Sequence, residues 1–284
     1  MKFTKMHGIG NDYIYVNGFE EQIDHPAEVA RAVSDRHFAI GADGLILILP
    51  STRADFRMRM FNADGSEAQM CGNGIRCLAK YVYDHGLTRQ TMIQVETLAG
   101  VLELQLFPHG GVIDKVRVKM GAPRLERAQI PMQGPAGQVL CEPLVVNGTT
   151  FEVTAVSMGN PHCIVFVDDP HTFDVTGWGP HFEHHAAFPE GVNTEFVRVL
   201  DAHTFTMRVW ERGSGETLAC GTGASAVAVA CHLTGRTGRR MTGHLLGGSL
   251  ELAWDETDNQ VYMTGPAAEV FHGEWSGKGA DNHD

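Results

Sequence analysis

The chain has 284 residues, enough for two domains of ordinary size, and its composition is that of a globular protein, with 43% hydrophobic and 20% charged residues. A net charge of −12 argues against a nucleic-acid partner or an anionic membrane surface, because both attract proteins rich in lysine and arginine. The N-terminus does not resemble a signal peptide, and no apolar run approaches the length of roughly 20 residues that a membrane span needs. We therefore expect a cytoplasmic protein with reduced thiols.

The predicted elements are mostly strands and turns, with a few helices. In chain order, helices are predicted over 26–37, 74–84 and 223–233, and the last two each begin after a CGxG turn and end at a glycine. The third helix is apolar on every side, which is typical of a buried helix. Strand-like runs fill much of the remaining chain, for example at 91–107, 112–120, 140–146 and 248–254.

Two cysteines lie in copies of one local sequence, 149 positions apart. One copy, residues 56–88, contains Cys71, and the other, residues 205–237, contains Cys220. Aligned without a gap, the two copies are identical at ten of 33 positions. The same offset aligns two Gly-Asn pairs, GN at 10–11 and GN at 159–160, each followed by a strand-like run. A period this long indicates a duplicated domain, because solenoid repeats are much shorter.

We therefore predict an α+β protein of two pseudo-symmetric, duplicated domains, each a mainly antiparallel β-sheet or barrel wrapped around a central buried helix. Residues 1–120, completed by 266–273, would form the half that carries Cys71, and residues 121–265 the half that carries Cys220. The last residues, 274–284, are predicted to be disordered.

Each of the two cysteines precedes a helix, where unpaired backbone N–H groups and the positive end of the helix dipole meet. This position predicts a thiol pKa below the free value of about 8.5. The adjoining glycines let the backbone approach an anion such as a carboxylate. A thiolate on one side and a thiol on the other could remove a proton α to that carboxylate and return one to the opposite face. This chemistry needs no pyridoxal cofactor and no metal.

The ordinary interpretation of a buried cysteine is a small core residue, and we assign it to Cys77, Cys141, Cys163 and Cys231. For Cys71 and Cys220 the matched repeat favours acid/base chemistry, with a disulfide between them as the alternative. The HFEHH run at 181–185 resembles a metal-binding pattern, but its spacing and polar context favour a solvated loop.

Several motifs together resemble the diaminopimelate epimerase family: NADGSEAQMCGNGIRC, SMGNPHC and ERGSGETLACGTGA, with KMHGIGND, HFAIGADG and YMTGPA. They span residues 5 to about 266. The resemblance implies a cofactor-independent enzyme that interconverts LL- and meso-diaminopimelate in lysine and peptidoglycan-precursor biosynthesis. It also implies a homodimer with no nucleic-acid or membrane partner.

The resemblance also implies roles for individual residues. Cys71 and Cys220 would be the acid/base pair, and His162 and Glu211 would lie close to the thiols and the substrate amine. The reacting carboxylate would bind at the two helix N-termini, through Gly72, Asn73, Gly221 and Thr222. The distant end of the substrate would be held by Asn62, Asn160, Asn193 and Arg212, with help from Asn11.

The chain departs from the family pattern at Gly44, where some members of the family carry a glutamine that reaches the substrate, so any role of Gly44 is expected to be through its backbone. Turn chemistry is the alternative for Asn62, Asn160 and Asn193, and simple packing is the alternative for His162.

Two other functions compete with this interpretation. One is another two-thiol racemase, of the proline or hydroxyproline type, although Arg212 and the asparagines argue for a substrate with a second charged end. The other is a catalytically silent binding protein of the same fold, which the presence of both cysteines argues against.

Overall fold

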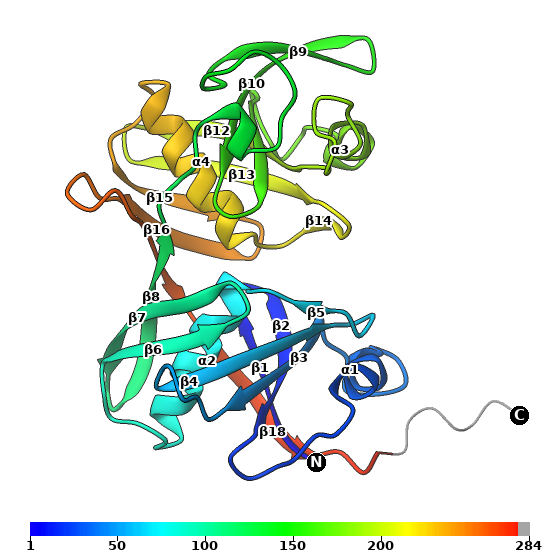
Figure 1. The fold of residues 1–284 in the computed structure, drawn as a ribbon, viewed down its shortest axis with the longest axis vertical. Coiled ribbons are helices and arrows are strands. Elements are labelled where there is room, and N and C mark those ends of the chain that lie inside the picture. The colour runs from blue at the N-terminus through cyan, green and yellow to red at the C-terminus, as the bar shows by residue number, and fades with distance from the viewer. Residues whose placement is uncertain (278–284) are drawn as a thin grey trace, which may run out of the picture. The chain divides into compact units, whose positions relative to one another are not determined.

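The computed structural model describes residues 1–277 and divides into two compact units (Figure 1). Unit 1 comprises Met1–Val118 and the segment that begins at Gly265, and unit 2 comprises Lys119–Thr264. Within the expected disordered tail, Glu274 ends a strand and the Trp275 N–H donates to the Met1 carbonyl. Residues 278–284 lie outside the described part of the chain.

Unit 1 is a mainly antiparallel sheet with α2 against it. Its strands pair in the order β18, β1, β2, β3, β4, β6, β7, β8, and the pairs β2–β3 and β4–β6 are parallel. The elements are β1 (Lys2–Gly8), β2 (Asn11–Asn17), α1 (Pro26–Ser34), β3 (Gly44–Leu49), β4 (Phe56–Asn62), β5 (Glu67–Ala68), α2 (Gly72–Asp84), β6 (Met92–Thr97), β7 (Gly100–His109), β8 (Val112–Gly121) and β18 (Ala268–Glu274).

Unit 2 repeats this strand order, with β9, which precedes β10 in the chain, at the edge that the C-terminal β18 occupies in unit 1. Its strands pair in the order β9, β10, β11, β12, β13, β15, β16, β17, with β11–β12 and β13–β15 parallel. The elements are the 3₁₀ helix η1 (Arg127–Gln129), β9 (Glu142–Val146), β10 (Thr149–Ser157), β11 (Pro161–Phe166), α3 (Val175–Glu183), β12 (Asn193–Asp201), β13 (Thr204–Glu211), β14 (Gly215–Thr217), α4 (Gly221–Leu233), β15 (Arg240–Leu245), β16 (Gly248–Trp254) and β17 (Val261–Pro266).

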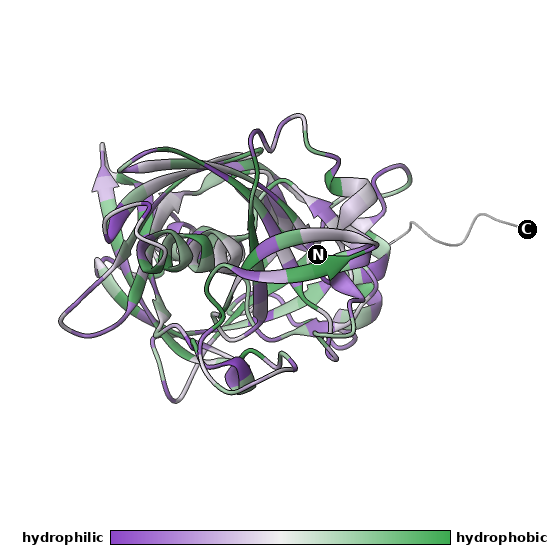
Figure 2. Ribbon diagram, turned by 90° about the horizontal axis from the view of Figure 1, so that it is seen from above, coloured by the Kyte–Doolittle hydropathy of each residue, from purple (hydrophilic) through white to green (hydrophobic). Residues whose placement is uncertain are grey.

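The buried helix of each unit is confirmed. In α4, every residue from Gly223 to Cys231 is buried, and the helix contacts β10, β11, β12, β15 and β16. Figure 2, coloured by hydropathy, shows a helix with strands around it. In α2, even the charged Arg76 has no exposed surface. Because both faces of α4 meet strands, an apolar sequence without a polar stripe is what this position requires. The predicted fold class, two duplicated α+β halves each built around a buried helix, is therefore confirmed.

The structure differs from the predictions in four ways. Cys141, predicted to be a small core residue, is exposed, so that prediction is wrong. The run at 91–107 is a hairpin, β6 and β7, that turns at Leu98-Ala99, where the Thr97 hydroxyl oxygen accepts from the Ala99 N–H. The helix expected over 26–37 ends at Ser34.

The last difference is the helix α3, which the sequence does not predict. Its Gly177, Gly179 and Pro180 are poor helix formers, but Asp174 caps its first turn by accepting from the Gly177 N–H at 2.9 Å. Part of the HFEHH run therefore belongs to this helix, and Phe182 is fully buried, so the prediction of a solvated loop over 181–185 is wrong for these positions. No helix among the described residues is long and apolar enough to cross a membrane.

Candidate functional site

The thiol of Cys71 is the N-cap of α2. The Gly74 N–H donates to its Sγ at 3.3 Å, so the cysteine side chain occupies the position that Ser or Asp usually takes at a helix start. Gly72 and Asn73, the first two helical residues, are both buried. Backbone N–H groups in this first turn have no partner within the helix, which is the property expected of an anion-binding turn.

Asn11, at the start of β2, reaches the same thiol. Its Oδ1 accepts from Cys71 Sγ at 3.2 Å and from Asn73 Nδ2 at 3.4 Å. The preceding turn is tight, since Gly10 has a φ of 90°, and its counterpart Gly159 in unit 2 has a φ of 103°. The structure thus brings together three of the predicted residues, Asn11, Cys71 and Asn73.

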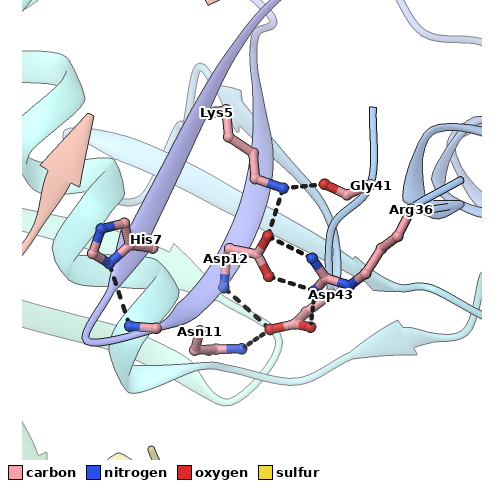
Figure 3. A network of polar contacts seen from close by, with 8 residues as sticks. Lys5, His7, Asn11, Asp12, Arg36, Gly41 and Asp43 are labelled. Atoms are coloured by element: carbon pink, nitrogen blue, oxygen red, sulfur yellow. Dashed lines mark hydrogen bonds and ion pairs between the residues drawn. The ribbon is translucent and has the colours of Figure 1, made fainter. Parts of the chain in front are cut away.

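A charged network holds the other end of the Asn11 amide (Figure 3). Asn11 Nδ2 donates to Asp43 Oδ2 at 2.7 Å, and the Asp12 N–H donates to the same oxygen at 3.1 Å. Arg36 bridges Asp43 and Asp12 at 2.8 and 2.7 Å. Burial and the neighbouring Asp12 charge raise the pKa of Asp43. Because a carboxylate accepts from Nδ2, the Asn11 oxygen is turned toward the thiol.

Asn62 and Gly44 lie opposite each other on β4 and β3. Asn62 Nδ2 donates to Ser66 Oγ at 3.0 Å within its own turn. A Cβ on Gly44 would approach the carbonyl oxygen of Phe61 more closely than van der Waals contact allows. Gly44 is therefore required by strand packing, and Asn62 makes its hydrogen bond within its own turn.

Cys220 is the N-cap of α4, as Cys71 is of α2. The Gly223 N–H donates to its Sγ at 3.4 Å, and Thr222 Oγ1 lies 3.5 Å from the sulfur. The prediction of a lowered thiol pKa is wrong for Cys220. Burial is the largest cause that raises the pKa of this thiol well above 9, and the nearby carboxyl groups of Glu211 and Glu195 raise it further. These effects outweigh the helix N-terminus.

A chain of hydrogen bonds leads from a buried carboxylate to this thiol. Glu195 Oε1 lies 2.7 Å from His162 Nδ1, and His162 Nε2 lies 3.0 Å from Asn160 Oδ1. Asn160 Nδ2 donates to Thr222 Oγ1 at 3.3 Å, next to Cys220. Neither Glu195 nor His162 has exposed surface. His162 and Asn160 are thus not simply a packed residue and a turn residue.

Glu211, Asn193 and Arg212 lie at the ends of neighbouring strands. Glu211 Oε1 accepts from the Thr217 hydroxyl at 2.5 Å, and its carboxyl group interacts with Cys220; burial raises the pKa of Glu211. Asn193 Oδ1 accepts from the Arg212 N–H at 3.0 Å. The structure therefore places these three predicted residues together, with Glu211 at the thiol.

Glu195 is the residue of this site that sequence reasoning missed. It stands in the strand-like run NTEFVRV, where an acidic residue is easily taken for a solvent-facing one. The 149-residue offset carries a usable signal, because it aligns Glu195 with Ile46, a position that an apolar strand buries. Among the described residues, no group of three or more His, Cys, Asp or Glu side chains is arranged to hold a metal ion.

Comparison with known proteins identifies the family. The family model described as diaminopimelate epimerase matches residues 3–126 and 154–270. A diaminopimelate epimerase of Acetivibrio thermocellus is 57% identical over 274 residues, which cover 96% of this chain and 98% of that protein. One from Desulfovibrio desulfuricans is 55% identical over 281 residues, which cover 97% and 98%.

Solved structures with the same fold are much more distant in sequence. A hydroxyproline epimerase from Agrobacterium vitis has a TM-score of 0.70 at 16% identity, covering 96% of this chain and 91% of that one. A phenazine biosynthesis protein of the PhzF family from Bacillus anthracis has a TM-score of 0.68 at 16% identity, covering 96% and 97%. These similarities show the fold alone. The family match and the relatives above 50% identity show that this chain belongs to the diaminopimelate epimerase family.

Proposed function

We propose that this protein is a diaminopimelate epimerase, which interconverts the LL and meso forms by inverting one α-carbon. The observation that carries the proposal is the repeated thiol: Cys71 and Cys220 cap equivalent helices in two halves of one topology. Membership of the epimerase family supports diaminopimelate as the substrate. The reaction would supply lysine and peptidoglycan precursors.

In each direction, one sulfur removes a proton and the other returns one. The α C–H bond breaks as its proton passes to a thiolate, and a thiol delivers its own proton to the opposite face of the same carbon. The raised pKa keeps Cys220 protonated at neutral pH, which is the form that donates. In the direction in which Cys220 donates, Cys71 is the base, and the reverse reaction exchanges the two roles.

The first turns of α2 and α4 would hold the reacting carboxylate. Gly72, Asn73, Gly221 and Thr222 begin these helices, and their N–H groups would stabilise the negative charge that develops on the carboxylate oxygens. We propose that Asn62, Asn160, Asn193 and Arg212, assisted by Asn11, bind the distant amino-acid end. Glu211 and His162 would support the thiols. No cofactor is needed in this scheme.

We expect the enzyme to act in the cytoplasm, where thiols stay reduced. We also expect a homodimer, which the family resemblance implies. A proline or hydroxyproline racemase is the weaker alternative, because the relatives with more than half of their residues identical are diaminopimelate epimerases.

Hydrogen exchange tests the proposal. In deuterated buffer without pyridoxal phosphate, the purified protein should introduce deuterium at the α position of LL-diaminopimelate and form the meso isomer, as followed by proton NMR. Proline in a parallel sample should not exchange. Exchange of proline but not of diaminopimelate would contradict the proposed substrate, and exchange of neither would favour a binding protein.

A further inference from the structure

The two halves differ most in what lies behind the thiol. A Cβ added to Gly74 in unit 1 would lie 2.7 Å from the Ile46 side chain and 3.5 Å from Cys71 Cβ. A Cβ added to the equivalent Gly223 in unit 2 would lie 2.5 Å from Glu195 Oε1 and 3.2 Å from Cys220 Sγ. At the same point of the duplicated fold, an apolar side chain supports one thiol and a carboxylate approaches the other.

Burial of this carboxylate is costly. Glu195 has no exposed surface, and its Oε2 is buried with no hydrogen-bond partner among the described residues. Removing an ionised carboxylate from water costs several kcal/mol unless its hydrogen bonds are replaced. Its one strong contact is the 2.7 Å hydrogen bond between Oε1 and His162 Nδ1. A packed aliphatic residue, like Ile46 in the other half, would stabilise the strand at lower cost.

Both ring nitrogens of His162 have a hydrogen-bond partner. Nδ1 faces a carboxylate oxygen of Glu195, and Nε2 faces the amide oxygen of Asn160 at 3.0 Å. The contact with Glu195 therefore fixes the orientation of the ring and of the edge that meets Asn160. Asn160 is thereby oriented with its Nδ2 toward Thr222 Oγ1, which contacts the sulfur of Cys220.

We propose that Glu195 is a positioning residue for Cys220, which holds the His162 ring in place and thereby fixes the Asn160 amide and the Thr222 hydroxyl beside the thiol. This deepens the proposed epimerase function and rests on it for the catalytic consequence, while the hydrogen bond between Glu195 and His162 is a property of the protein alone. The titratable groups around the pair are Glu211 on β13, Cys163 on β11 and Cys220 on α4.

Imidazole ¹⁵N NMR of the full chain tests the proposal without substrate. The His162 signals are assigned by comparison with a His162→Asn variant. The parent protein should show a hydrogen-bonded proton on Nδ1 of His162, and Glu195→Gln should shift the Nδ1 signals because a neutral amide replaces the carboxylate. The proposal is wrong if the parent shows no proton on Nδ1, or if Glu195→Gln leaves the His162 signals unchanged.

Kinetics provide the second readout. Glu195→Gln should lower kcat by about 10- to 100-fold, as loss of a carboxylate that orients a functional histidine does elsewhere, with KM little changed. Glu195→Asp keeps the carboxylate and should recover part of kcat and the parent Nδ1 signal of His162. The same variant tests the proposal if Glu195→Gln does not fold. Glu216→Gln, which breaks a partly buried pair with Arg208 in the same unit, is the control and should retain activity.

Equal kcat values for Glu195→Gln and Glu216→Gln would reduce Glu195 to a structural residue and overturn the proposal. Failure of the parent protein to act on diaminopimelate would contradict the proposed function instead. That failure is distinguishable, because the NMR readout needs no substrate.

Discussion

Burial decides the chemistry of individual residues in this protein more than local helix geometry does. Cys220 stands where a helix N-terminus would lower a thiol pKa, yet burial and the carboxyl groups of Glu211 and Glu195 raise it. The cysteine positions could be predicted from the sequence, since the repeat marks them. The sign of the pKa shift could not, because it depends first on how deeply the folded unit buries the thiol, and then on the carboxyl groups of Glu211 and Glu195.

The raised pKa of Cys220 predicts its reaction with alkylating agents. Only the thiolate reacts, so the alkylation rate should rise about tenfold per pH unit and still be rising above pH 9. Glu211→Gln removes a negative charge, lowers the pKa of the thiol, and should raise the rate at pH 8. Mass spectrometry of the Cys220 peptide measures the rate, and the exposed Cys141 reports that the reagent is active. A plateau below pH 9 would contradict this prediction.

Asp43 is predicted to orient Asn11 toward Cys71. Asp43→Ala removes the acceptor for Asn11 Nδ2, so the amide is free to turn, and kcat should fall by about tenfold or more. Arg36→Ala is the matched control, because Arg36 contacts the other oxygen of Asp43 and not the amide. It should lower kcat less. An equal loss in both variants, measured with diaminopimelate, would mean that the charge network as a whole matters and not the amide contact.

Among the elements, those with strong local signals were predictable. The helices α2 and α4 begin at the first glycine of each CGxG segment, within two residues of their predicted starts, and end shortly before Gly86 and Gly235. α3 could not be predicted from local propensity, because two glycines and a proline interrupt it, and burial of Phe182 against Phe196 supports it instead. The duplication offers the missing signal, since α3 stands in unit 2 where α1 stands in unit 1.

The pairing of β3 with β4 predicts that Gly44 tolerates no side chain. Gly44→Ala forces a Cβ against the Phe61 carbonyl, and backbone cannot move aside as a flexible side chain could, so the free energy of unfolding should fall by about 1–3 kcal/mol. Gly238→Ala is the control, since nothing lies near its added Cβ. Urea denaturation measures both. A Gly44→Ala variant as stable as the parent would show that the strands can separate without cost.

At the scale of the whole molecule, one topology is used twice with different side chains. The halves share the helix-capping thiols, the Gly-Asn turns and two parallel strand pairs. They differ in that unit 2 has His162 and Glu195 where unit 1 has Tyr13 and Ile46. The shared features were evident from the repeat. The differences required the structure, because a substitution between repeats does not itself indicate whether a buried position has gained a function.

The central claim is that two thiols together invert one α-carbon of the substrate. Variants in which a single cysteine is replaced test this claim most directly. Cys71→Ala and Cys220→Ala should each abolish conversion of LL- to meso-diaminopimelate, because each removes one of the two proton carriers. The measurement is the formation of the meso isomer by the two variants and the parent, with circular dichroism to verify folding. Loss of conversion in both variants is the predicted result. Near-normal turnover by either one would contradict the two-thiol mechanism.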